Sequence, residues 1–428
     1  MSVNAMPMPR PGLRRYWRDR AIWTTVADVF AILVALTLPW STTLPSIFVP
    51  CWLGAVAWVT DWRAFWRLLR QPICYLPLAF AALAAVGTLW SEAAWGARLW
   101  SVGPLLKLLV LPGLFYHFSR SKRGMWVFIA FLVSCTLLMV VSWIVLIDPN
   151  LSLKPVAERA PGIFVKNYID QSQEFALCAV ALAYPIIRSI QANRLWRAVL
   201  LVAVSLGFLV NMSFVIVSRT AMVTIPVMIA VFALLHLKWR TSLIIACGLV
   251  ALTGLAFLVS AQLQQRAASI VSEYRIYKQQ NAASSVGLRL EYWRKSLQFI
   301  AAAPIIGNGT GSTLGLFQKA ASGESQDVTA QVIRNPHNQT LAVAVQWGIA
   351  GVVLLYAMWF VHLRLFRGEG LVAWIGLLVV VQNIFTSLFN SHIFDFHEGW
   401  MYVLGVGIAG GMILAERRGG PSAEWAGP

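Results

Sequence analysis

The chain has 428 residues, of which 58% are hydrophobic and only 12% are charged. A soluble domain is about half apolar and roughly a quarter charged, so these proportions exclude an ordinary water-soluble protein and favour a lipid environment. The formal net charge of +17 is spread over many short segments, whereas a nucleic-acid-binding protein would need one clustered basic face, so we expect no nucleic-acid partner.

Many separate apolar runs follow one another, and each is long enough to cross about 30 Å of hydrocarbon. Backbone groups in lipid must be paired internally, and the runs do not alternate as barrel strands do, so we predict an all-α integral membrane protein. We place about twelve transmembrane helices at residues 21–40, 46–60, 72–90, 103–118, 126–147, 174–187, 198–217, 220–237, 241–260, 339–361, 370–388 and 399–415.

The first apolar run is of spanning length and lacks a small-residue cleavage pattern, which indicates a transmembrane helix and not a cleaved signal. Pro50 in the second run predicts a kinked or re-entrant segment. Asp28, inside the first run, is expected to be paired or to face water.

Basic residues concentrate in one set of termini and short loops, which predicts that these segments are cytoplasmic. More than half of the 34 basic residues belong to this set. They are Arg10, Arg14, Arg15, Arg18, Arg20, Arg63, Arg67, Arg70, Arg120, Lys122, Arg123, Arg188, Arg194, Arg197, Lys238, Arg240, Arg364, Arg367, Arg417 and Arg418. We therefore expect cytoplasmic tails at 1–20 and 416–428, nine helices within 21–260, a long periplasmic loop at 261–338, and three helices within 339–415.

The loop at 261–338 is too long for a simple connector, and such loops are usually functional. Apolar residues at steps of three and four predict amphipathic helices at 263–277 and 288–300, which we expect to lie on the membrane surface and roof a cavity. A glycine-rich segment follows at 303–312. It is either a structural turn or a place where backbone amides approach a ligand, and both readings stay open.

Two charged or polar residues near the membrane edge are candidates for a functional site. His337 ends the long loop at the rim of the tenth predicted span, and Arg219 occupies a very short turn between the seventh and eighth spans. A charge so close to hydrocarbon is costly and tends to be functional. The alternatives are a packed or surface histidine and an arginine that reaches the headgroups.

At these residues the chain resembles the O-antigen ligase family, within a wider group of ligases, polymerases and protein oligosaccharyltransferases. The family pattern is His, then Asn, Ser or Gln, nine residues, Gly, two residues, and Gly, Thr or Tyr. The matching positions are His337, Asn338, Gly348 and Gly351. Further similar features are Ser218-Arg219, Arg289 ahead of an aromatic helix, and the turn Pro304…Gly307…Gly309.

The resemblance implies an inverting, metal-independent glycosyltransferase of the GT-C-like kind, without a cofactor, in the cell inner membrane with a periplasmic active site. Its partners would be an undecaprenyl-pyrophosphate-linked glycan donor, a lipid A–core acceptor and membrane lipids. It further implies His337 as the catalytic residue and Arg219 and Arg289 as pyrophosphate-binding residues.

The chemistry of these side chains agrees with that implication. Arginine forks match phosphate oxygens and can stabilise charge on a departing diphosphate. An unperturbed histidine titrates near pH 6.5, which suits removal of a hydroxyl proton at neutral pH. A general base would lead to inversion at the transferred sugar. Glu324 and Asp327 are isolated in the loop, so we expect no metal site.

Four residues are candidates for supporting roles. Arg159 and Lys166 could hold phosphates of either substrate, or be solvated charges. Asn338 can supply a hydrogen bond beside His337. Asp395 could orient an arginine or His337, or be a surface carboxylate.

Three other activities compete with ligation. A polymerase and a protein O-oligosaccharyltransferase would use the same donor with a different acceptor. A transporter usually carries internal repeats, broken helices and intramembrane carboxylates, but Asp28 is the only clear mid-span carboxylate, so transport is the weakest alternative.

Overall fold

The computed structural model describes residues 19–216, 218–280, 284–321 and 332–419. Within 219–280 the side chains of a number of residues, Arg219 among them, lie outside that description. The described chain is built of helices joined by turns, so the predicted all-α class is confirmed.

The first half of the chain, up to residue 214, forms α-helices and short 3-10 helices. They are α2 (Arg20–Thr37), α3 (Thr43–Val59), α4 (Trp62–Leu69), α5 (Pro72–Val86), α6 (Trp95–Val102), η1 (Gly103–Val110), α7 (Leu111–Phe118), α8 (Gly124–Ile147), η2 (Pro149–Leu151), η3 (Val156–Glu158), α9 (Tyr168–Ala181), α10 (Ala183–Gln191) and α11 (Leu195–Phe214).

The second half continues in the same way. Its helices are α12 (Arg219–His236), α13 (Trp239–Val259), α14 (Ala261–Gln280), α15 (Ser285–Ala302), α16 (Ser312–Ala321), α17 (Gln339–Leu365), α18 (Leu371–Thr386) and α19 (Phe396–Glu416). The two helices predicted in the long loop, at 263–277 and 288–300, correspond to α14 and α15.

Every predicted span overlaps helical structure, but fewer helices are long and apolar enough to cross a membrane alone. Seven meet that requirement in the described residues, or eight if a bent pair is counted as one span. Three further apolar helices are shorter: α5, α18 and Val223–Leu235 within α12. The chain is therefore a multi-pass membrane protein by helix length and composition, while the count of about twelve spans remains a prediction.

The second predicted span, expected to be kinked or re-entrant, is followed by a sharp bend. Pro50 lies inside α3, and the chain bends by 115° between α3 and α4. The side chain of Asp61 accepts hydrogen bonds from the backbone amides of Arg63 and Ala64, at 3.0 and 3.3 Å. This N-cap starts a new helix in a new direction.

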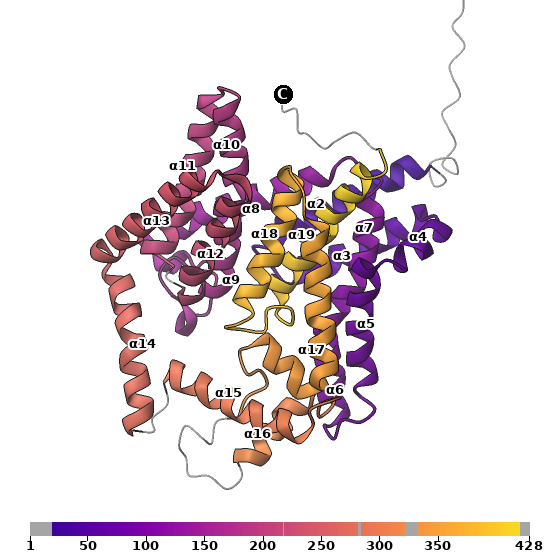
Figure 1. The fold of residues 1–428 in the computed structure, drawn as a ribbon, viewed down its shortest axis with the longest axis vertical. Helices are drawn as coiled ribbons and strands as arrows, with labels where there is room; N and C mark the ends of the chain where they lie inside the picture. Colours follow the sequence, from indigo (N-terminus) through magenta and orange to yellow (C-terminus); the bar gives the residue numbers. More distant parts are fainter. Residues whose placement is uncertain (1–18, 217, 281–283, 322–331, 420–428) are drawn as a thin grey trace, which may run out of the picture.

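The core is centred on α19, in which 94% of the 18-residue apolar window is buried. Figure 1 shows α17, α18 and α19 in the middle, with α3, α4, α5 and α7 on one side and α8 to α13 on the other. The turn between α10 and α11 and the helices α15 and α16 lie at opposite ends of the molecule. The candidate functional residues at 289 and 337 therefore lie away from the basic α10–α11 turn.

The carboxylate in the first span is paired, as expected. Asp28 is buried, and its Oδ1 accepts a hydrogen bond from the Ser121 hydroxyl at 2.6 Å and lies 2.8 Å from His117 Nε2. The Arg123 guanidinium lies 3.4 Å from Oδ2. These contacts join α2 to the α7–α8 turn and give Asp28 a structural role.

Candidate active site

The segment that carries His337 is held in an unusual conformation. His337 has a φ of +53°, a left-handed value that is rare for residues other than glycine. The Asn335 side chain accepts a hydrogen bond from the His337 backbone amide at 2.9 Å, and the Ser391 hydroxyl donates to the same oxygen at 2.7 Å. Trp293 of α15 donates its indole N–H to the carbonyl of Pro336 at 3.2 Å. Such strain is usually found where function requires it.

The ring of His337 is oriented by a chain of hydrogen bonds that ends on a carboxylate. Its Nδ1 lies 3.0 Å from Oδ1 of Asn390, and Nδ2 of Asn390 donates to Oδ2 of Asp395 at 3.0 Å. An ionised carboxylate can only accept, so the Asn390 amide nitrogen must face Asp395 and its oxygen must face His337. Nδ1 of His337 therefore carries a proton. When the ring is neutral, Nε2 is left as a proton acceptor.

Asp395 is itself fixed by buried cationic groups. His392 is fully buried, and its Nδ1 lies 3.3 Å from Asp395 Oδ2 and 3.7 Å from Glu398 Oε1. Burial by itself lowers the pKa of His392, but the two carboxylates outweigh it and raise the pKa to about 9. The Lys107 ammonium also donates to the backbone carbonyl of Asp395. His392 therefore holds the side chain of Asp395, and Lys107 holds its backbone.

The same three side chains form the one group in the described part of the chain whose geometry could hold a metal ion. Ligand atoms of His392, Asp395 and Glu398 all lie within 4.8 Å of one another. The sequence does not predict this group. Glu324 and Asp327, the isolated acids of the long loop, lie outside the described residues, and Asp395 was expected to orient an arginine or His337. Since Lys107 already neutralises part of this charge, independence from metal remains our prediction.

The glycine-rich turn serves as a packing element for α17. Within α17, Gly348 has a φ of +57° and a ψ of −152°, so the helix is broken there. Backbone amides of the turn donate hydrogen bonds to carbonyls that the break leaves without a partner in the helix. The amide of Gly309 donates to the carbonyl of Gln346 at 2.8 Å. In return, the amide of Ile349 donates to Pro304 at 2.8 Å. The geometry thus favours the structural reading of this turn, because its amides are used inside the protein.

Helix α15 carries an aromatic residue that contacts His337 and the arginine expected to bind pyrophosphate. The ring of Tyr292 lies beside that of His337, with centroids 6.3 Å apart. Arg289 precedes Tyr292 by three residues, so both lie on neighbouring parts of one helix face. Glu291, buried, pairs with Arg294 and stabilises the same helix.

Arg219 begins α12. Its side chain lies outside the described part of the structure, so its role in this site remains a prediction.

The remaining candidates have structural partners. Lys166 is buried, and its ammonium lies 2.7 Å from Glu174 Oε1, so it is not a solvated charge. The Arg159 guanidinium donates to the carbonyl of Lys154 and to the side chain of Asn150. Their phosphate-binding role remains a prediction.

Asn338 caps the helix that follows His337. Its Oδ1 accepts a hydrogen bond from the amide of Leu341 at 3.1 Å at the start of α17, and its Nδ2 donates to the carbonyl of Leu388 at 3.1 Å. Asn338 therefore fixes the end of the His337 segment against the turn that follows α18.

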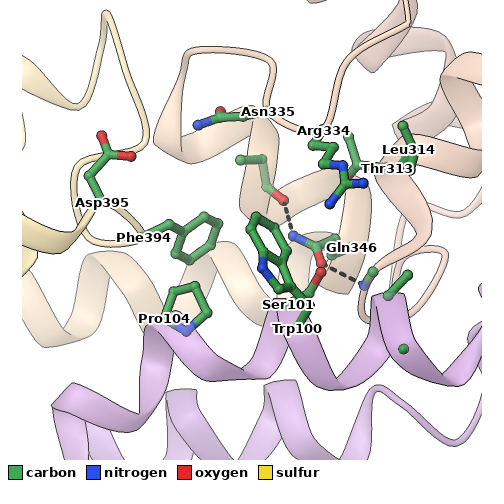
Figure 2. Close-up of a pocket in the computed structure, with 14 residues that line it drawn as sticks. Trp100, Ser101, Pro104, Thr313, Leu314, Arg334, Asn335, Gln346, Phe394 and Asp395 are labelled. Carbon is green, nitrogen blue, oxygen red and sulfur yellow. Dashed lines mark hydrogen bonds between the residues drawn. The ribbon is translucent and has the colours of Figure 1, made fainter. Parts of the chain in front are cut away.

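A cavity of about 340 Å³ adjoins this network. Figure 2 shows its lining side chains, among them Trp100, Arg334, Asn335, Phe394 and Asp395. Asn335 and Asp395 belong both to the cavity wall and to the hydrogen bonds around His337. The cavity thus borders the residues that hold His337 in place.

Comparison with known proteins identifies one family. A family model described as O-Antigen ligase matches residues 204–356. The matched range includes Arg219, Arg289 and His337, so the resemblance seen in the sequence is confirmed for this part of the chain. No curated protein matches the chain.

Proposed function

We propose that this membrane protein is an O-antigen ligase, which transfers a glycan from undecaprenyl pyrophosphate to a sugar hydroxyl of lipid A–core. The observation that carries the proposal is the position of His337, inside the range matched by the O-antigen ligase model and oriented by Asn390 with Nε2 available as a proton acceptor. The enzyme would lie in the inner membrane with this site facing the periplasm.

In the proposed reaction, the acceptor oxygen attacks the anomeric carbon of the donor sugar from the side opposite the diphosphate. The new C–O bond forms as the bond between the sugar and the diphosphate breaks, so the configuration inverts. Nε2 of His337 takes the proton of the acceptor hydroxyl. Arg219 and Arg289 bind the diphosphate and stabilise the negative charge that it gains.

The hydrogen-bond chain behind His337 suits a general base. Asp395 and Asn390 keep the proton on Nδ1, which prevents the ring from presenting an N–H to the acceptor hydroxyl. The imidazolium formed in the reaction would donate two hydrogen bonds, one of them to Asn390. Asn390 is a positioning residue in this proposal, because it acts through His337.

The test is ligation by the purified full-length protein in vesicles, with lipid-linked glycan and lipid A–core. His337→Ala should lower kcat by roughly 10²–10⁴, the usual contribution of a general base, while donor binding is retained. Wild-type turnover by His337→Ala at saturating donor and acceptor would remove the base assignment. A parallel reaction with EDTA should be unaffected. Loss of activity restored by magnesium would direct attention to His392, Asp395 and Glu398.

The competing activities share the donor and differ in the acceptor. The same assay should therefore include a second lipid-linked glycan, which a polymerase would extend, and a serine-containing peptide, which a protein O-oligosaccharyltransferase would modify. Transfer to lipid A–core alone supports a ligase. Donor-independent substrate flux through vesicles would instead indicate a transporter.

A further inference from the structure

We propose that the cavity beside His337 is a binding site for a single sugar ring of one of the two substrates; the proposal rests on the function above. Its volume of about 340 Å³ is at the small end of ligand pockets, which are about 300–1,000 Å³. That size suits a single ring and excludes a long stretch of glycan or a polyprenyl chain. The site would therefore select the sugar next to the reacting atoms.

The lining of the cavity has the two kinds of surface that a sugar ring requires. Trp100 and Phe394 offer aromatic surface for the C–H faces of a pyranose. Trp100 is 61% exposed, so a large part of its indole is not used in protein packing. The Arg334 guanidinium lies 5.3 Å from its ring centroid and holds the indole beside the His337 segment.

Polar groups in the cavity wall remain available for hydroxyl groups. Among the described residues, the hydroxyl of Ser101, Nδ2 of Asn335 and the Arg334 guanidinium have no hydrogen-bond partner. Gln346, at the floor, is already used, since its Oε1 accepts from Gly311 at 2.8 Å and its Nε2 donates to Ala342 at 3.1 Å (Figure 2). The wall thus combines a rigid floor with free donors above it.

Arg334 and Asp395 both line the cavity, so its net charge is near zero, which suits a neutral sugar better than a phosphate. Asp395 lines the wall, and a carboxylate repels a phosphate but accepts hydrogen bonds from hydroxyl groups. Arg289, one of the two arginines assigned to the diphosphate, is not among the lining residues. The diphosphate and this cavity are therefore different parts of the proposed site.

Its connection to the catalytic residue sets where the sugar would lie. Asn335 supplies a wall of the cavity and accepts from the His337 amide, and Asp395 supplies another wall and holds Asn390. A ring bound here would therefore contact two of the residues that hold His337 and Asn390 in place. Either the first sugar of the donor or the accepting sugar of lipid A–core has the required chemistry.

Two substitutions on α6 distinguish the loss of a sugar-binding surface from a general disturbance of this helix. Trp100→Ala removes the aromatic surface in the cavity. The matched control is Trp95→Ala, because Trp95 is also on α6, is 60% exposed and has the Arg98 guanidinium 4.5 Å from its ring, but does not line the cavity. Trp100→Phe retains an aromatic ring.

Steady-state kinetics of the full-length protein in vesicles should show the effect in KM. We expect Trp100→Ala to raise KM about tenfold, Trp100→Phe to restore most of the loss, and Trp95→Ala to leave both KM values near wild type. A rise confined to the donor assigns the site to the donor sugar, and a rise confined to lipid A–core assigns it to the acceptor. Unchanged KM values for both substrates in Trp100→Ala would overturn the sugar site.

A binding measurement makes this outcome independent of ligation. Saturation-transfer NMR with deacylated core oligosaccharide and with glycan released from the donor should detect binding to wild type that Trp100→Ala weakens. Trp100-dependent binding without ligation would mean that the proposed function is wrong and the sugar site stands. Ligation with no Trp100-dependent binding and no KM change would mean that the sugar site is wrong and the proposed function stands.

Discussion

At the scale of single residues, the site depends on contacts that join positions far apart in the sequence. His337 was found from its place at a membrane edge and from the spacing to Gly348 and Gly351, which are local signals. Asn390, which orients it, is 53 positions away and follows a different helix. The polar residues after α18 were a usable hint, but nothing in the sequence alone places Asn390 opposite Nδ1. Tertiary packing supplies that information.

The two arginines are expected to act through the planar fork of the guanidinium. Arg219→Ala and Arg289→Ala should lower kcat by roughly 10²–10³, the usual cost of losing one group that stabilises transition-state charge. Arg→Lys should recover little, because lysine keeps the charge and loses the bidentate geometry. Arg275→Ala, an exposed arginine on neighbouring α14, is the control and should be near wild type. Near-normal ligation by both lysine variants would show that positive charge is enough.

The raised pKa of His392 makes a prediction about stability and pH. A histidine whose folded-state pKa is about 9, above its ordinary value of 6.5, stabilises the fold fully below about pH 6.5. That contribution, about 3 kcal/mol at most, is lost as pH rises through 9. Melting curves should therefore show wild type well above His392→Gln at pH 6, with the two converging by about pH 9.5. A difference that stays constant with pH would contradict the protonated assignment.

At the scale of elements, helix α17 shows what periodicity predicts and what it misses. The apolar pattern predicted a helix at 339–361, and α17 covers this range. The break at Gly348 was not predicted, because a helix can contain glycine without breaking. The break exists because the turn at 303–311 packs against it: a Cβ on Gly348 would lie 2.5 Å from the backbone of Ile305.

Gly348→Ala tests whether this break positions the site. Alanine is strained at a φ of +57° and a ψ of −152°, which costs about 1–3 kcal/mol before the contact with Ile305 is counted. We expect a lower melting temperature and reduced ligation. Gly315→Ala is the control, because a Cβ there meets nothing within 4 Å in helix α16, and it should be neutral or slightly stabilising. Equal melting temperatures for the two variants would refute a structural role for the break.

At the scale of the whole molecule, composition was enough to predict the membrane class and the all-α fold, but not the number of crossings. Short helices such as α5 and α18 have the apolar character of a crossing without its full length. The bend between α3 and α4 also makes crossings hard to count, because the predicted span ends there and a short amphipathic helix follows in a new direction. Hydropathy reports burial from water and does not distinguish lipid from protein neighbours.

The orientation of the molecule is predicted from charge alone and is open to a direct test. Basic residues at the α10–α11 turn predict a cytoplasmic position for Arg194, whereas Ser322, outside the described residues, is predicted to be periplasmic. Single cysteines at these positions should be made in a background where the exposed Cys51 and Cys247 are replaced by serine, since all five native cysteines are free thiols.

An impermeant thiol reagent on intact spheroplasts should then label position 322 and spare 194 until the membrane is opened. Figure 1 supports the physical basis, because the α10–α11 turn and the α15–α16 region lie at opposite ends of the molecule. Labelling of 194 but not 322 would place His337 on the cytoplasmic side, where a periplasmic transfer to lipid A–core is impossible. The orientation therefore decides whether the proposed reaction has access to its acceptor.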